Sequence, residues 1–148
     1  MQNDRGPLVI GLSSQKDCLG YRVIVKSVER VADHAVKIAE NVLSLSEKVD
    51  PAVFQKISEM SLFARSVFND SIESLFKKDY MLADNMVAKA KTIASMQNKT
   101  INAIAKKLEL TEMSNIRMIT ESIRRTAEYA SDIAEIVLNL NVNQITTD

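Results

Sequence analysis

The chain has 148 residues, about the length of one domain, and 46% of them are apolar and 26% charged, which is typical of a globular protein with a single core. Nineteen basic residues balance nineteen acidic ones, which argues against a general binder of nucleic-acid phosphates. The single cysteine, Cys18, excludes an internal disulfide and fits a reducing compartment. No apolar run approaches the roughly 20 residues that cross a bilayer. We therefore expect a cytoplasmic protein without a signal peptide or membrane insertion.

Helix breakers are confined almost entirely to the start of the sequence. All three glycines and Pro7 lie within the first twenty residues, and Pro51 is the only later proline. A long segment so poor in glycine and proline favours helix. We expect residues 1–18 to form an extended lead-in or linker, residues 19–141 a helical bundle, and residues 142–148 a polar tail.

The first predicted helix runs from about residue 19 to residue 49. Its apolar residues recur at three- and four-residue spacing, which predicts one stripe that faces the core. That stripe consists of Tyr21, Ile24, Val28, Val31, Ala35, Ile38, Val42, Leu45 and Val49.

Three further helices follow. Asp50 is expected to cap the second helix, which ends near Lys77, and Asp79 to cap the third. The fourth helix is predicted from about residue 115 to residue 140, after a break at Thr111 or Ser114. Its inward residues are expected to be Ile116, Ile119, Ile123, Ala130, Ile133, Val137 and Leu140. Four long helices with short connections predict an all-α antiparallel bundle.

An internal repeat appears when the sequence is shifted by 95 positions. Twelve positions of the first helix then meet identical residues in the fourth, among them the polar pairs Ser27 with Ser122 and Arg30 with Arg125. We interpret this match as a duplication in which each long helix closes a three-helix unit. The second unit is complete, and the first is represented only by its last helix, which suggests further sequence upstream.

The repeated helices resemble one known family. The segment SVERVADHAVKIAENV (27–42) is similar to the signature helix of the PhoU family, cytoplasmic regulators of phosphate uptake and phosphate signalling, and SIRRTAEYASDIAEIV (122–137) is similar to the matching helix of that family's other repeat. The resemblance covers residues 18–140. It implies two three-helix units related by pseudo-twofold symmetry. DCLGYRVIVKSVERVADHA (17–35) looks most like relatives that carry an AbrB-like DNA-binding domain ahead of the bundle.

The resemblance also implies a metal site. The family motif E/D-x-x-x-D matches Glu29 and Asp33, and Glu40 extends the same acidic face. Hard oxygen ligands one helical turn apart can share iron, zinc or another divalent or trivalent cation, which relieves their mutual repulsion. The alternative is a solvated face whose acids are neutralised by nearby cations, namely Lys26, Arg30 and Lys37.

The second repeat departs from this motif. The matching positions are Arg124 and Glu128, an acid–base pair that needs no metal, whereas Glu128 and Asp132 form an acid pair one turn further on. Either an ion pair has replaced the second site or its ligands have shifted by a turn, and we favour replacement. Asp70 and Glu73 are the further acids that a larger metal cluster would need.

These features favour a non-enzymatic regulator. Such a bundle would dock onto a phosphate transporter or a sensor kinase, or transmit a signal to an attached DNA-binding domain for transcription regulation, without itself contacting nucleic acid. A homodimer through an uncovered apolar face is also expected. One alternative is a carboxylate metal enzyme on a four-helix bundle, which needs inward Glu-x-x-His pairs that this chain lacks. Another is a plain helical oligomerisation module without a ligand.

Overall fold

The structure, a computed structural model, describes the backbone of residues 15–45 and 49–145 and the side chains of those residues up to Leu140. Within these ranges the chain is helical and contains no strand. The elements are α2 (Gln15–Leu43), α3 (Pro51–Lys77), α4 (Tyr80–Ala90), α5 (Ile93–Ile104), a 3-10 turn η1 (Ala105–Lys107) and α6 (Leu110–Ile145). The all-α prediction is confirmed.

Two helix starts follow the predicted capping chemistry. The Asp50 carboxylate accepts a hydrogen bond from the backbone N–H of Ala52 at 2.8 Å, directly ahead of α3. The Asp79 carboxylate accepts one from the N–H of Leu82 at 2.9 Å, at the start of α4. Each cap satisfies a backbone donor that has no partner inside the helix.

Helix α6 begins five residues before the predicted position, so Thr111 and Ser114 lie inside the helix rather than capping it. The cap is formed by two glutamates. The carboxylate of Glu112 accepts from the backbone N–H of Glu109 at 3.4 Å, and the Glu109 carbonyl accepts from the N–H of Met113 at 2.9 Å. This is the return half of a capping box, with an acid three residues inside the helix reaching back to the cap.

Other boundaries also differ from the prediction. Helix α2 already includes residues 15–18, which were predicted as lead-in, and it ends at Leu43 rather than near residue 49. The third predicted helix is divided into α4 and α5, with a break where the Thr92 hydroxyl donates to the Lys89 carbonyl at 2.8 Å. Helix α6 continues to Ile145, into the predicted polar tail. Residues 1–14 of the predicted lead-in lie outside the described residues.

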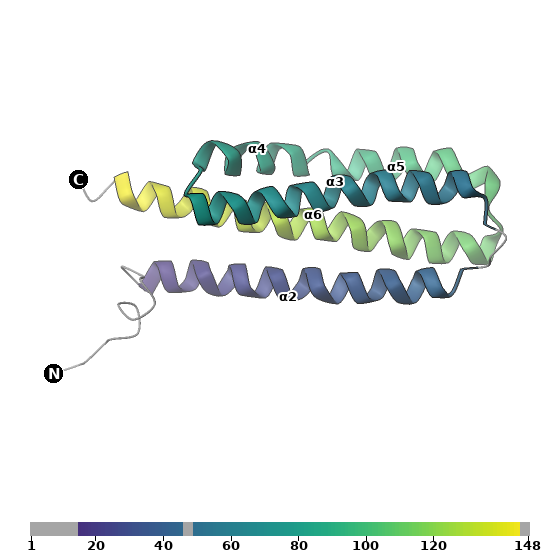
Figure 1. Cartoon of the computed structure of the whole chain (residues 1–148), viewed down its shortest axis with the longest axis horizontal. Coiled ribbons are helices and arrows are strands. Elements are labelled where there is room, and N and C mark those ends of the chain that lie inside the picture. The colour runs from purple at the N-terminus through teal and green to yellow at the C-terminus, as the bar shows by residue number, and fades with distance from the viewer. Residues whose placement is uncertain (1–14, 46–48, 146–148) are drawn as a thin grey trace.

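Helix α6 is the central element of the bundle. Helices α3, α4 and α5 pack on it to form a three-helix arrangement, because α4 and α5 follow each other along one line, and α2 packs along another side of α6. Figure 1 shows α2 and α6 running in opposite directions, with α6 extending beyond α2 at its C-terminal end. The polar positions Ser27 and Ser122, equivalent in the predicted repeat, are both buried; the duplication itself stays a prediction.

The core lies around α6. Six of the seven residues predicted to face inward from this helix are buried, and Leu140 is half-buried. Five of the buried residues pack with α3, α4 and α5 in two clusters along the bundle. Ile116, Ile119 and Ile123 belong to the cluster around Met60 and Ile104, and Ala130 and Val137 belong to the cluster around Val67 and Met86.

The prediction that the apolar residues of the first helix form one stripe facing the core is wrong. Ile24 is buried, but Tyr21, Val28, Ala35 and Val42 are exposed. At 100° per residue the predicted set combines two neighbouring stripes of α2. One stripe, which contains the buried Ile24 and Ser27, packs on α6, and the other is not covered by the described residues.

Candidate functional site

Polar side chains join α2 to α6 near the middle of both helices. His34 Nδ1 and Ser122 Oγ form a hydrogen bond of 3.1 Å, and the His34 ring lies 5.9 Å from the ring of Tyr129, centroid to centroid. The guanidinium of Arg125 donates to the Tyr129 hydroxyl at 3.1 Å. Because α2 and α6 pack closely here, residues far apart in the sequence meet in one polar cluster.

His34 is held towards its neutral form in this cluster. Burial lowers the pKa of His34 below its ordinary value of 6.5, and the positive charges of Lys37 and Arg125 lower it further. The carboxylates of Asp33 and Glu121 act in the opposite direction but are outweighed. A neutral imidazole beside two cations is a hydrogen-bonding group rather than a charged one.

A row of ion pairs continues along α6. Arg124 contacts Glu121 at 2.6 Å and Glu128 at 3.7 Å, and Arg125 contacts Glu128 at 3.1 Å. Burial alone would raise the pKa of Glu121, but hydrogen bonds from Arg124 and Gln97 outweigh it and lower that pKa. The Arg124–Glu128 ion pair is the one expected if the second acidic site has been replaced.

The predicted metal ligands lie on two separate helices. Glu29, Asp33 and Glu40 are exposed on α2, and Asp33 forms an ion pair of 3.8 Å with Arg30. On α6, Glu128 is held by two arginines. Burial and the neighbouring Glu135 and Glu128 raise the pKa of Asp132, against the effect of Arg125. Two acid pairs are therefore present, but they do not converge on one point.

The donor set offers a cation few protein ligands. Among the residues whose placement is described, no group of three or more His, Cys, Asp or Glu side chains is arranged to hold a metal ion. Glu73 on α3, one of the further acids named from the sequence, is engaged by Lys77. A cation on Glu29 and Asp33 would have two protein ligands and would complete its shell with water.

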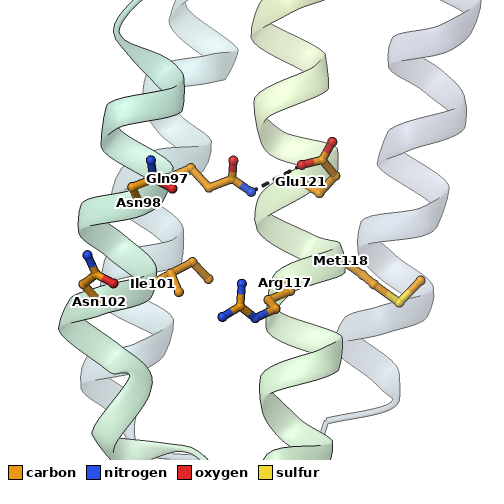
Figure 2. A pocket seen from close by; sticks show the side chains of 7 residues that line it. All are labelled: Gln97, Asn98, Ile101, Asn102, Arg117, Met118 and Glu121. Carbon is orange, nitrogen blue, oxygen red and sulfur yellow. Dashed lines mark hydrogen bonds between the residues drawn. The ribbon is translucent and has the colours of Figure 1, made fainter.

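A polar groove of about 600 Å³ opens between α5 and α6 (Figure 2). Gln97, Asn98 and Asn102 line it from α5, and Arg117 and Glu121 line it from α6, with Ile101 and Met118 beside them. Gln97 Nε2 donates to Glu121 Oε2 at 3.4 Å, the contact dashed in Figure 2, where the Arg117 guanidinium extends towards α5. Amide and guanidinium donors at one groove suit carbonyl or carboxylate groups.

Sequence reasoning missed this groove. The groove depends on three carboxamides, two of them four residues apart. Carboxamides do not titrate and bind metals weakly, so their presence in a sequence does not by itself indicate a site. The signal that was present is the spacing of Asn98 and Asn102, which places both on one helix face.

A second, apolar groove of about 150 Å³ lies where α2, α3 and α6 meet. Val31, Ala35 and Ile38 line it from α2, and Phe68 lines it from α3. Its walls carry little polar surface, so it suits an apolar side chain rather than a polar ligand.

The fold and these grooves define an elongated helical bundle with open binding surfaces. The protein-family model of the PhoU domain matches residues 57–137, which span most of α3 and continue into α6. The chain therefore belongs to the PhoU family. No solved structure gives a significant match, and no helix within the described residues has the length and apolar character needed to span a membrane.

Two relatives support the assignment. A phosphate-specific transport system accessory protein PhoU homolog of Borreliella burgdorferi is 25% identical over 141 residues, which cover 87% of this chain and 62% of the relative. A protein of the same name from Aquifex aeolicus is 30% identical over 81 residues, covering 55% of this chain and 37% of the relative. The matched part thus spans less than two thirds of either relative.

Proposed function

We propose that this protein regulates phosphate uptake and phosphate signalling by docking onto a component of a phosphate transport system or its sensor kinase, without catalysing a reaction. The observation that carries the proposal is family membership, joined to two relatives whose names describe accessory proteins of phosphate-specific transport. An AbrB-like domain attached to the bundle would give the same signal a route to transcription.

The groove between α5 and α6 is the docking surface that we favour. Its amide and guanidinium donors can pair with the backbone carbonyls and carboxylates of a partner segment. Arg117 is exposed and forms no ion pair with the described residues, so its charge is available to a partner. Glu121, in contrast, is already paired with Arg124. The groups of the groove that remain available to a partner are therefore mainly hydrogen-bond donors.

Co-purification from cells tests this proposal. The tagged full chain is expected to retain proteins of the phosphate transport system, and Arg117→Glu is expected to reduce that retention at least several-fold because the groove loses its free positive charge. Lys91→Glu, an equal change of charge at an exposed position of the α4–α5 break, is the control and should retain them. Equal retention by both variants would place docking elsewhere, and retention of no transport or kinase protein by the wild-type chain would contradict the proposal itself.

The acidic face of α2 is proposed as the place where a cation would act on this regulator. Glu29 and Asp33 are exposed and one turn apart, and the contact between Asp33 and Arg30 is long enough to be displaced by a divalent or trivalent cation. Glu128 and Asp132 form a weaker candidate pair, because the arginines that hold Glu128 would have to be released.

A further inference from the structure

Arg117 lines the groove between α5 and α6 without a carboxylate partner. Glu121 follows it four positions later on α6, at the spacing where an arginine and a glutamate form an ion pair on a helix. Glu121 instead contacts Arg124 at 2.6 Å and accepts a hydrogen bond from Gln97 at 3.4 Å. The acid of the groove is therefore neutralised from the other side, and the Arg117 guanidinium keeps its charge for a bound group.

Two carboxamides line the α5 side of the same groove, one helical turn apart. Asn98 and Asn102 are both exposed, and neither side chain forms a hydrogen bond with the described residues. Figure 2 shows them one above the other on α5. Each carboxamide has an acceptor oxygen and two N–H donors, so it can pair with both the N–H and the C=O of a peptide backbone.

The spacing of the two asparagines matches an extended chain. Four residues of helix rise about 6 Å, and two residues of an extended chain span roughly 6.6 Å. In an extended chain the N–H and C=O groups of every second residue point to the same edge. Asn98 and Asn102 can therefore meet two such residues at once. A helix already uses its backbone groups internally and would leave both carboxamides without this pairing.

We propose that this groove binds an extended segment of a partner protein, whose backbone pairs with Asn98 and Asn102 and whose acidic side chain pairs with Arg117. The inference rests on the proposed function, in which docking occurs at this groove, and it names what the partner presents there. A guanidinium binds a carboxylate through two parallel hydrogen bonds, which fixes the position of the acidic residue as well as its charge. The exposed thioether of Met118, which also lines the groove, adds an apolar contact.

The groove also sets where the acidic residue lies. Gln97 meets Glu121 at one end, and α5 and α6 run in opposite directions (Figure 1). The position of Arg117, one turn before Glu121, therefore lies towards the Asn102 end of the groove (Figure 2). A bound acidic side chain is expected there, because at the opposite end it would approach the carboxylate of Glu121.

Selection of random decapeptides on the full chain tests the side-chain preference. Peptides selected on the wild-type chain are expected to share an acidic residue, and those selected on Arg117→Glu to carry a basic residue at that place. Fluorescence anisotropy should show that the acidic peptides bind Arg117→Glu at least several-fold more weakly, while Asn85→Ala, which removes an exposed carboxamide from α4, binds them normally. All three positions are exposed or lie at the groove surface, and circular dichroism confirms that each variant stays helical. Absence of a shared acidic residue, or equal binding by Arg117→Glu, would overturn the proposal.

Backbone methylation of a selected peptide tests the extended conformation. Methylating each peptide nitrogen in turn is expected to weaken binding at least several-fold at two positions that are two residues apart. The combined variant Asn98→Ala and Asn102→Ala should bind the unmethylated peptide several-fold more weakly and should no longer respond to methylation at those two positions. Equal responses in the wild-type chain and the variant would overturn the proposed backbone pairing. Neither measurement uses a protein of the phosphate system, so a chain that fails here but retains transport proteins would leave the proposed function standing.

Discussion

His34 on α2 and Ser122 on α6 are joined by a hydrogen bond of 3.1 Å although they lie 88 positions apart in the sequence. Ser122 is buried and His34 half-buried, so the bond is partly shielded from water. It is a polar connection between α2 and the helix around which the rest of the bundle packs. The pairing also leaves the imidazole with a fixed partner in its neutral form.

Removal of the Ser122 hydroxyl should loosen the contact between α2 and α6. We expect Ser122→Ala to lower the free energy of unfolding by about 1 kcal/mol, because a partly buried ring nitrogen loses its hydrogen-bond partner. Urea unfolding followed by circular dichroism measures the change. Ser114→Ala, at an exposed position of the same helix, should change the stability by much less. An equal loss in both variants would show that the His34–Ser122 bond contributes nothing specific.

The stability of the protein should also fall as the solution becomes mildly acidic. The pKa of His34 is lowered in the folded chain, so the unfolded chain takes up a proton at a higher pH than the folded chain does. Stability is therefore complete above the ordinary histidine pKa of 6.5, and it declines as the pH falls below that value towards the folded pKa. Unfolding measured between about pH 7 and pH 5 should show this slope, and His34→Gln should flatten it. A slope that persists in the variant would mean that groups other than His34 cause it. Asp50 and Glu121 would not be those groups, because the pKa of each carboxyl is lowered below its ordinary value.

The core of α6 was predictable because its apolar residues form one stripe. On α2 the same reasoning failed, since two apolar stripes lie side by side and periodicity alone does not say which one meets a neighbour. Ile24 and Tyr21 both fit the spacing, yet Ile24 is buried and Tyr21 is exposed. The choice is made by packing against α6, which only the fold supplies.

Helix starts were predictable where the cap is a side chain of the usual type. Asp50 and Asp79 cap α3 and α4 as expected. The start of α6 was misplaced because threonine and serine are stronger capping signals than glutamate, and here Glu112 supplies the cap by reaching back to Glu109. The break between α4 and α5 carries no proline or glycine, so no strong signal marked it.

The candidate site was predictable only in part. Spacing correctly indicated that Arg124 and Glu128 form an ion pair, because residues four apart on a helix are neighbours. Whether acids of different helices converge depends on how α2 and α6 are rotated about their axes. The spacing of residues along the sequence does not predict that rotation. The groove at Arg117 depends in the same way on the packing of α5 against α6.

Gly20 lies where α2 comes close to the C-terminal part of α6. A Cβ atom added at this position would lie 3.1 Å from Cγ2 of Ile136 and 3.9 Å from Cδ2 of Leu140. Cγ2 of Ile136 branches directly from Cβ and cannot swing aside alone, but Ile136 and Leu140 are both half-buried, so α2 and α6 can separate by the few tenths of an ångström that one methyl group needs. Gly20→Ala is therefore expected to raise the free energy of unfolding by about 0.5 kcal/mol, since alanine has a higher helix propensity than glycine.

Gly20→Leu is expected to destabilise the protein because a larger side chain would separate the helices. Thermal unfolding of both variants provides the measurement, and destabilisation by alanine would show that the contact with Ile136 is rigid.

The acid pair Glu29 and Asp33 on α2 can be tested for metal binding. If Glu29 and Asp33 share a cation, the purified chain should contain iron, zinc or another divalent or trivalent metal by elemental analysis, and Glu29→Gln combined with Asp33→Asn should lose it. Neutral amides keep the size of the side chains and remove the charge that hard cations require. Glu59→Gln on α3, an exposed acid already paired with Lys56, should leave the metal content unchanged. A wild-type chain that binds no added iron or zinc, with a double variant of equal or greater stability, would make the pair a solvated surface whose repulsion is relieved by Arg30. The bundle would then act through its docking surfaces alone.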